Sequence, residues 1–404
     1  MAVSPARAVI LTSVLPFPPT SGSHKRTLRL IEAIERAGAV PHLLTIDVGE
    51  PGAAEELRAR GWIVEQFTEP GASPAARLRQ HLERRPSPYL HNLARRLREI
   101  APGSAFVQIE HTQNAYYWEA IGSTRSVLSL HNVDSQMLAS IARGSRGLAR
   151  LRGLNRAMSM RSVERRAVSR ADVVLAVSRR DSRHFEPRAR RVLEVPNGID
   201  DELFGISTEL PDSEDILFFG QLDYAPNEIG LTRFVRDGWS RLAAARPAAR
   251  LLVAGKGAST ELLRTLGEHE RVIPLGFVPD IRSVLEQSRL VLVPLWHGAG
   301  TRLKVLEALA SARPIAGTPL GVEEIGFVDD RHGLLADSPV QLADIATRLL
   351  SDRQLSSSLA QEGRRLAERY RWSSVLEPLE QLYRGWIGDR NRRETHSPSS
   401  PSLS

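Results

Sequence analysis

The chain has 404 residues, of which 42% are apolar and 25% are charged, and its formal net charge is +7. This composition is typical of a globular protein of two or three domains, and the positive charge suits anionic partners such as nucleotides, phosphorylated lipids or acidic membrane surfaces. The sequence has no apolar run of about 20 residues and no cysteine, which excludes a transmembrane helix, disulfides, thiol nucleophiles and cysteine-ligated zinc.

The N-terminal stretch "MAVSPARAVILTSVLPFPP" has only a short apolar segment and no small-residue cleavage site. It is therefore not typical of a secretory signal peptide. We interpret "RAVILTSVL" as the first strand and expect the protein in the cytoplasm.

The first half of the chain alternates short apolar runs with segments of helical spacing. The predicted strands are residues 8–14, 40–47, 62–67, 105–110, 126–131 and 172–178, and the segment 192–200 closes this half. The predicted helices are residues 25–37, 52–60, 74–100 and 133–170.

A second, similar series follows. Its predicted strands are residues 215–220, 250–255, 271–276, 289–295 and 314–318, and its predicted helices are 227–245, 259–267, 279–287, 301–311, 339–350 and 354–368. Short apolar strands that alternate with helices indicate βαβ units and parallel sheets. The sequence thus predicts an α/β protein with two doubly wound domains, whose ligands bind beyond the carboxyl ends of the strands.

The strand 289–295 is followed by a glycine-containing turn and a helix. We expect Thr301 to cap this helix, with Arg302 and Lys304 in its first turn. Cations there oppose the helix dipole, so their presence favours an anion such as a phosphate at the helix start. The alternative is a basic first turn that faces solvent.

Glu307 lies one turn after Lys304. It either forms an i,i+3 ion pair with Lys304 or accepts hydrogen bonds from two ribose hydroxyls, as acidic residues behind phosphate-binding helix starts do. Lys256, in "VAGKGAST", repeats the pattern of strand, glycine and helix. Lys25, Lys256 and Lys304 are the only lysines in a chain rich in arginine, and each lies close to a glycine.

The loop "LPFPPTSGSHKR" follows the first strand and includes Ser21, Gly22 and Lys25. It lacks the G-x-G-x-x-G pattern of a dinucleotide site, and Gly22 indicates a turn where backbone approaches a ligand closely. A proline-rich surface loop is the alternative. In "SLHNVDS", His131 ends a strand and is followed by Asn132 and Asp134. At this position a functional and a structural role for the histidine are about equally expected.

Residues 143–170 are strongly basic and carry an apolar stripe of Leu148, Leu151, Leu154 and Met158. This segment is predicted either to face an acidic membrane or an anionic acceptor, or to be a solvated arginine-rich helix. No aromatic interleaving or recognition motif supports nucleic-acid binding.

Several of these segments together resemble the GT-B glycosyltransferases of family 4. The resemblance rests on "PPTSG", "HNVDS", "VPNGID", "FFGQLDYAPN" and "GAGTRLKVLEALASARPI" and covers about residues 5–388. It implies two Rossmann-like domains that face a cleft. These are an acceptor-side domain at 1–200, a nucleotide-sugar domain at 201–370, a terminal helix at 371–388 that returns to the first domain, and a disordered tail at 389–404.

The resemblance also implies roles for individual residues. His131 would contact the transferred sugar, and Gly22 would let the first loop approach the donor. Arg302 and Lys304, with amides around Gly300 and Thr301, would hold the diphosphate, and Glu307 would bind the ribose. Ser21, Lys25, Asn132 and Asp134 would lie in the acceptor-side loops.

Two features depart from the family pattern. Ala299 stands where the family usually has the first of two glutamates, and "GQLDYAPN" lacks the usual arginine and lysine after the strand-end glycine. We expect Lys256 and Arg302 to supply that charge.

The sequence therefore predicts a retaining hexosyltransferase that uses a UDP- or GDP-sugar, without cofactor or essential metal. The expected acceptor is a glycan, a lipid-linked sugar or a secondary metabolite, with peripheral association at the inner face of an anionic membrane through 143–170. The alternatives are a nucleotide-sugar epimerase or hydrolase, and a non-catalytic partner subunit that binds nucleotides or carbohydrate.

Overall fold

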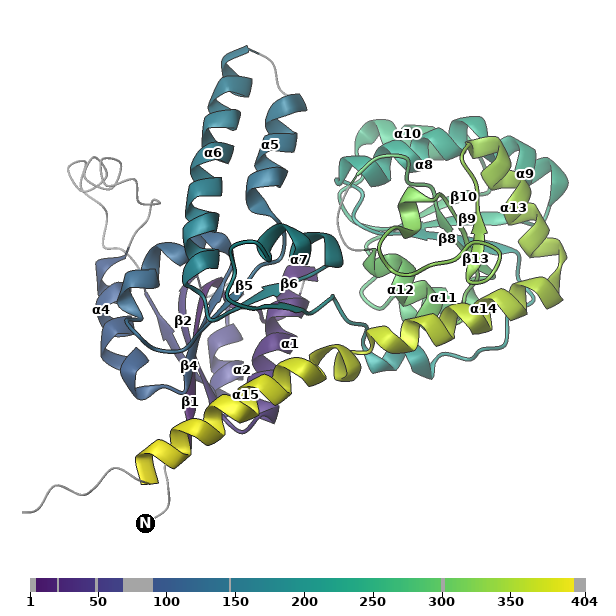
Figure 1. The fold of residues 1–404 in the computed structure, drawn as a ribbon. Helices are drawn as coiled ribbons and strands as arrows, with labels where there is room; N and C mark the ends of the chain where they lie inside the picture. The colour runs from purple at the N-terminus through teal and green to yellow at the C-terminus, as the bar shows by residue number, and fades with distance from the viewer. Residues whose placement is uncertain are drawn as a thin grey trace, which may run out of the picture. The chain divides into compact units, whose positions relative to one another are not determined.

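The computed structural model describes residues 5–19, 22–47, 50–67, 90–144, 147–298 and 302–395. The chain divides into two compact units (Figure 1). Unit 1 comprises Met1–Pro196 and Leu376–Ser404, and unit 2 comprises Asn197–Val375.

Unit 1 is built on a sheet whose described strands are all parallel. Their order is β3-β2-β1-β4-β5-β6-β7. In chain order they are β1 (Arg7–Val14), β2 (Val40–Asp47), β3 (Ile63–Gln66), β4 (Phe106–Glu110), β5 (Ser126–Ser129), β6 (Val173–Ala176) and β7 (Val192–Glu194). The chain leaves β1 toward β2 and later returns to β4 on the other side. The topological switch point therefore lies between β1 and β4, where ligands of such sheets bind.

The helices of unit 1 fill the connections between these strands. They are α1 (Gly22–Arg36), α2 (Ala53–Ala59), α4 (His91–Ile100), α5 (Asp134–Gly144), α6 (Gly147–Arg170) and α7 (Arg179–Phe185), with the 3₁₀ segments η1 (Ala101–Gly103) and η2 (Thr112–Ala120). Strand residues such as Val9, Leu11, Val107 and Ile109 are almost fully buried and join one core cluster with residues of α4 and η2.

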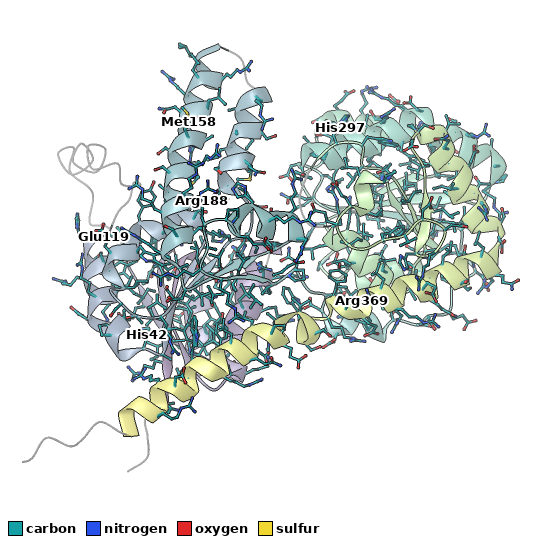
Figure 2. The ribbon with its side chains drawn as sticks, in the orientation of Figure 1. His42, Glu119, Met158, Arg188, His297 and Arg369 are labelled. Atoms are coloured by element: carbon teal, nitrogen blue, oxygen red, sulfur yellow. The ribbon has the colours of Figure 1, made fainter. Side chains whose placement is uncertain are left out.

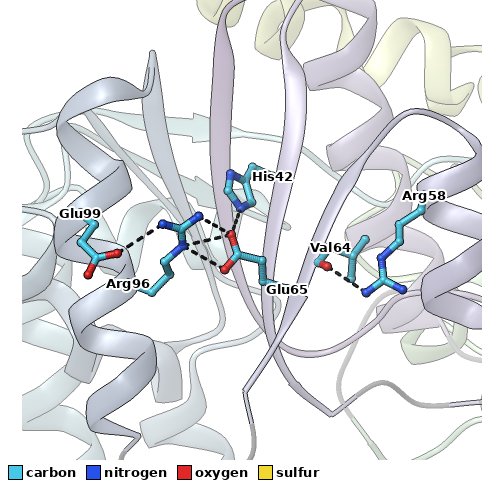
Figure 3. Close-up of polar contacts among 6 residues, drawn as sticks. All are labelled: His42, Arg58, Val64, Glu65, Arg96 and Glu99. Atoms are coloured by element: carbon cyan, nitrogen blue, oxygen red, sulfur yellow. Dashed lines mark hydrogen bonds and ion pairs between the residues drawn. The ribbon is translucent and has the colours of Figure 1, made fainter.

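One edge of this sheet is fixed to α4 by a charged cluster (Figure 3). The guanidinium of Arg96 donates three hydrogen bonds of 2.9–3.1 Å to the carboxylate of Glu65 on β3. His42 Nε2 on β2 lies 2.7 Å from the same carboxylate. Planar guanidinium groups bind carboxylates in this bidentate manner, which fixes orientation as well as contact.

Unit 2 repeats the design with described strands in the order β10-β9-β8-β11-β12-β13, again all parallel. The strands are β8 (Asp215–Phe219), β9 (Arg250–Ala254), β10 (Val272–Gly276), β11 (Leu290–Val293), β12 (Ile315–Gly317) and β13 (Gly333–Leu335). Its switch point lies between β8 and β11.

The helices of unit 2 are α8 (Ala225–Asp237), α9 (Trp239–Ala245), α10 (Thr260–Gly267), α11 (Arg282–Gln287), α12 (Leu303–Ala310), α13 (Pro339–Ser351) and α14 (Arg353–Ala367), with the 3₁₀ segments η3 (Asp201–Gly205), η4 (Leu320–Val322) and η5 (Glu368–Tyr370). Three of them begin with a side-chain cap that accepts a backbone N–H bond, which satisfies an orphan donor of the first turn. The caps are Ser259, Ser338 and Asp352.

The last helix, α15 (Trp372–Thr395), belongs to unit 1 from Leu376 onward. Tyr383 is fully buried, stacks on Phe106 at 4.6 Å between ring centroids, and donates its hydroxyl to Gln108. Glu380 accepts a 2.7 Å bond from Arg36. The helix continues past residue 388, so residues 389–395, which we predicted to be disordered, are helical; residues 396–404 lie outside the described residues.

The structure confirms the predicted α/β class with two parallel sheets and corrects several elements. The predicted helix 227–245 is two helices that are divided at Gly238, where a Cβ would lie 2.5 Å from the carbonyl oxygen of Pro339, so that only glycine fits there. The predicted helix 133–170 is the pair α5 and α6, and we did not predict β13. Most of the predicted helix 74–100 lies outside the described residues. Within the described residues, no helix is long and apolar enough to cross a bilayer.

Helix α8 approaches the backbone after β11 so closely that we predict a strong effect of one methyl group. A Cβ at Gly230 would lie 1.9 Å from the carbonyl oxygen of Pro294, so either α8 or the end of β11 must move in Gly230→Ala. We expect a loss of about 2–3 kcal/mol in the free energy of unfolding, measured by urea denaturation. Gly267→Ala is the control, because a Cβ there meets no atom within 4 Å; a loss of equal size in the control would contradict the steric explanation.

Candidate active site

Three segments of unit 1 meet at the carboxyl edge of its sheet. Glu110 is the last residue of β4, His131 lies two residues after β5, and Ser23 lies in the first turn of α1. His131 bridges the other two, since its Nε2 lies 3.1 Å from Glu110 Oε2 and its Nδ1 lies 3.1 Å from Ser23 Oγ. The sequence singled out His131, and the structure gives it two partners.

The carboxylate of Glu110 is fully buried. It is surrounded by hydrogen-bond donors: Gln108 Nε2 at 2.5 Å, His131 Nε2 at 3.1 Å and Thr27 Oγ1 at 3.4 Å. Burial alone would raise the pKa of Glu110, but the hydrogen bond from His131 and the neighbouring histidines outweigh it and the pKa falls below its ordinary value. Glu110 is therefore an ionised carboxylate.

This charge fixes the tautomer of His131. An ionised carboxylate only accepts hydrogen bonds, so Nε2 of His131 carries the proton. Burial lowers the pKa of His131 in spite of Glu110. The ring is therefore neutral near pH 7, and Nδ1 accepts a hydrogen bond from the hydroxyl of Ser23. Glu110 acts as a positioning residue that presents this Nδ1 at the carboxyl edge of the sheet.

His111 stands beside this pair with a positive φ of 64° and a ψ of 149°, outside the left-handed helical region. Its ring centroid lies 4.0 Å from that of His131. Burial, followed by the proximity of His131, lowers the pKa of His111 to about 4. Non-glycine residues with positive φ cost conformational energy and cluster at functional sites.

Arg26 on α1 is also buried, with 1% of its surface exposed, and donates to the carbonyl of Val195 at 2.7 Å. Burial lowers its pKa to about 10, an effect that the charge of Glu110 opposes. Arg26 therefore stays a cation and offsets the buried carboxylate electrostatically.

In unit 2 the chain is tightly packed at the carboxyl ends of β8 and β9. Gly220 follows β8 with φ 144°, and a Cβ at Gly255 would lie 2.0 Å from the carbonyl oxygen of Gly220. The backbone N–H of Leu222 donates to the backbone carbonyl of Lys256 at 2.8 Å, which joins the loop after β8 to the loop after β9. The Lys256 residue itself is exposed.

Lys304, on α12, reaches the same edge. Its ammonium donates to Asn227 Oδ1 at 2.7 Å and lies 4.6 Å from the centroid of the Phe218 ring. Asn227 in turn donates to the carbonyl of Gln221 at 2.7 Å, which orients its amide oxygen toward the lysine. Burial, with a further contribution from Arg302, lowers the pKa of Lys304 to about 7.

Arg302, and not Thr301 as we predicted, is the N-cap of α12. It is 6% exposed, and burial lowers its pKa. Its Nε is buried without a hydrogen-bond partner among the described residues. Within the same residues, neither Arg302 nor Lys304 forms an ion pair with a carboxylate, although burying a cation without one is costly.

For the other predicted site residues that it describes, the structure gives a position and a degree of burial. Glu307 is half-buried on α12, Asp134 is the half-buried first residue of α5, and Lys25 and Asn132 are exposed. Gly22 is the first residue of α1. Ser21, Ala299, Gly300 and Thr301 lie outside the described residues.

Sequence reasoning missed Glu110, His111 and Asn227. Glu110 and His111 carried one signal, since they end and follow a predicted strand, and Asn227 ends the stretch "FFGQLDYAPN". Among the described residues, no cluster of three His, Asp or Glu side chains could hold a metal ion.

Family models match both units. The model described as "Glycosyltransferase Family 4" matches residues 20–203, and the model described as "Glycosyl transferases group 1" matches residues 213–352. A curated relative, D-inositol 3-phosphate glycosyltransferase of Corynebacterium urealyticum, is 27% identical over 147 residues. That match covers 33% of this chain and spans about a third, 35%, of the relative.

Solved structures match nearly the whole chain. Anabaena Alr3699/HepE in complex with UDP has a TM-score of 0.65 at 17% identity and covers 93% of this chain and 99% of its own. Sucrose-phosphate synthase from Thermosynechococcus elongatus has a TM-score of 0.63 at 16% identity, with 95% and 100% covered. WaaG, a glycosyltransferase of lipopolysaccharide biosynthesis, has a TM-score of 0.60 at 16% identity, with 93% and 99% covered. At these identities the likeness establishes the fold, which is GT-B.

The low pKa of His111 predicts a pH dependence of stability. An unfolded histidine titrates near 6.5 and the folded one at about 4, so this residue's stabilising contribution is complete above pH 6.5 and is lost as pH falls to 4. The loss amounts to roughly 3 kcal/mol. We expect His111→Asn, whose side chain does not titrate, to remove this pH dependence.

Urea unfolding at several pH values measures this contribution as the difference in free energy between wild type and variant. The exposed His91, also in unit 1, provides the control His91→Asn. A difference between wild type and His111→Asn that stays constant from pH 7 to pH 4 would disprove the assignment.

Proposed function

Because the chain belongs to the glycosyltransferases of group 1 and family 4, which use nucleotide sugars, we propose that it transfers a hexose from a UDP- or GDP-sugar with retention of anomeric configuration. The acceptor in this proposal is a glycan, a lipid-linked sugar or a secondary metabolite, as in polysaccharide biosynthesis. In this proposal the reaction needs no essential metal. The protein works in the cytoplasm, whose reducing conditions do not affect a chain that has no cysteine and therefore no disulfide.

The observation that carries this proposal is the pair of cations Arg302 and Lys304. Arg302 is buried and Lys304 is half-buried at the switch-point edge of unit 2, and neither has a carboxylate partner among the described residues. Buried charges are normally paired, so this arrangement favours an anionic ligand. A diphosphate at the start of α12 supplies the missing charge and uses the free Nε of Arg302.

The chemistry of the leaving group explains why the cations matter. When the sugar departs, negative charge develops on the β-phosphate, and preorganised cations and amides stabilise it. We assign this role to Lys304 and Arg302, together with the backbone amides of Gly300 and Thr301 and the charge of Lys256. Glu307 is proposed to bind the ribose hydroxyls.

On unit 1, His131 is proposed to contact the transferred sugar. Its Nδ1 accepts a hydrogen bond from the Ser23 hydroxyl, and a sugar hydroxyl can replace Ser23 as the donor to this atom. Gly22 lies at the start of α1, beside Ser23, where backbone can approach the donor. Ser21, Lys25, Asn132 and Asp134 are proposed to line the acceptor-side loops.

The base and the sugar are distinguished by experiment. Anabaena Alr3699/HepE has been solved in complex with UDP and with UDP-glucose, so uridine is the first nucleoside to test. A thermal-shift screen of nucleoside diphosphates identifies the base, since a ligand that binds only the folded state raises the melting temperature. Radiolabelled donors of that base, incubated with candidate acceptors, then identify the reaction.

A labelled acceptor product supports the transferase. Free epimerised or hydrolysed donor without acceptor product would instead assign an epimerase or hydrolase. Ligand binding without turnover for any donor would indicate a non-catalytic partner subunit, which the alanine at position 299 makes worth testing.

Lys304→Ala tests the diphosphate site. We expect kcat to fall by about 10²-fold or more, as when one donor to a developing oxyanion is lost. Wild-type affinity for the nucleoside diphosphate should fall as pH rises above 7, because the bound anion raises the pKa of Lys304 from about 7 and binding takes up a proton.

Calorimetric titrations from pH 7 to pH 9 measure this second effect, and in Lys304→Ala the pH dependence should flatten. Arg348→Ala, which removes an exposed cation of α13, is the matched control. An unchanged rate in Lys304→Ala would remove this residue from the site.

A further inference from the structure

Helices α5 and α6 form an antiparallel pair that projects from unit 1, away from its sheet (Figure 1). The projecting part carries a group of large apolar side chains that are unusually exposed. They are Met137 at 46%, Ile141 at 62%, Leu148 at 70%, Leu151 at 65% and Met158 at 65% of their surface. Met158 is labelled on α6 in Figure 2.

The packing between the two helices explains this exposure. A Cβ at Gly153 would lie 2.7 Å from the Cβ of Ala142, so the helices meet through small residues. Ala142 and Ala157 are 2% and 5% exposed. Because small residues fill the contact between α5 and α6, the larger apolar residues of α6 are left outside it.

These larger residues share one face of α6. At about 100° per residue, Leu148, Leu151 and Met158 fall within about 80° of one another. Arginines lie around this face, and those that are exposed on the described parts of the pair are Arg143, Arg150, Arg152, Arg156, Arg161, Arg165, Arg166 and Arg170. An apolar stripe bordered by basic residues is the pattern of helices that lie in the interface of an anionic bilayer.

Acidic residues do not neutralise this surface. Asp134 and Glu164 are the acidic residues of the described parts of α5 and α6, and both lie at the end of the pair that joins the sheet. Glu164 is 2% exposed and accepts hydrogen bonds from the backbone N–H and hydroxyl of Ser135 at 3.2 and 3.0 Å. The projecting part is thus purely basic.

We propose that the α5–α6 pair docks unit 1 onto an anionic lipid surface. Leu148, Leu151 and Met158 enter the interface between headgroups and acyl chains, and the arginines contact lipid phosphates. A second copy of the chain fits this surface less well, because it would bring the same arginines against it. Since α5 begins three residues after His131, docking through the far end of the pair turns the carboxyl edge of the unit 1 sheet toward the bilayer, on the side from which a membrane-embedded acceptor would come.

Flotation of the full chain with vesicles tests the proposal without donor or acceptor, so its outcome is independent of the transferase assignment. We expect binding to phosphatidylcholine vesicles that contain phosphatidylglycerol, weak binding to pure phosphatidylcholine, and release by salt. The triple variant Leu148→Ser, Leu151→Ser, Met158→Ser should bind at least about tenfold more weakly. Each arginine reversed to glutamate at 150, 152 or 156 should cost about fivefold or more.

The control is the double variant Leu263→Ser, Val340→Ser in unit 2. Leu263 and Val340 are apolar and are 46% and 43% exposed. Circular dichroism confirms that the variants fold. Equal binding of wild type to both kinds of vesicle, no binding to either, or unchanged binding of the serine variant overturns the proposal. So does a dimer that the serine variant dissociates, since it would assign this face to a second copy.

Insertion can be measured directly because the chain has no cysteine. Leu151→Cys and Leu263→Cys each offer a single thiol for an environment-sensitive fluorophore. We expect a blue shift on addition of anionic vesicles for Leu151→Cys and none for Leu263→Cys. Equal spectra at the two positions would contradict docking through α6.

Discussion

Parallel strand pairing is the constraint from which both candidate sites follow. Every described strand pair in the two sheets is parallel, so the carboxyl ends of neighbouring strands lie along one edge of each sheet. That edge collects residues that are far apart in the sequence: Glu110 with His131 in unit 1, and Asn227 with Lys304 in unit 2. Ligands of such sheets bind at the switch point, which lies between β1 and β4 in unit 1 and between β8 and β11 in unit 2.

The two edges treat buried charge in opposite ways. In unit 1 the carboxylate of Glu110 is satisfied by the protein's own donors, and the result is a fixed tautomer of His131. In unit 2 the positive charges of Arg302 and Lys304 are left without a carboxylate among the described residues. The pKa of Lys304 is lowered to about 7, mainly because burial disfavours its charged form. The first arrangement positions a side chain, and the second favours an anion.

The projecting helix pair follows from a third balance. Small residues at Ala142 and Gly153 let α5 and α6 approach closely, and this leaves large apolar residues without a place in the core. The predicted stripe of residues 143–170 is confirmed as exposed at Leu148, Leu151 and Met158, whereas Leu154 is half-buried. Sequence periodicity could identify the stripe, but only the packing of α5 decides that it faces outward.

The sequence by itself determined the α/β class and most strands, and it singled out His131, Arg302 and Lys304 as candidate site residues. It did so because apolar periodicity and strand-end position are local properties of the chain. Helix breaks at Gly238, the short strand β13 and the roles of Glu110, His111 and Asn227 were decided only by tertiary structure. In the sequence Glu110 is one more residue of a predicted strand. Only the pairing of β4 with β5 brings His131 Nε2 to 3.1 Å from Glu110 Oε2. Burial, and with it charge state and pKa, depends on neighbours that the linear sequence does not specify.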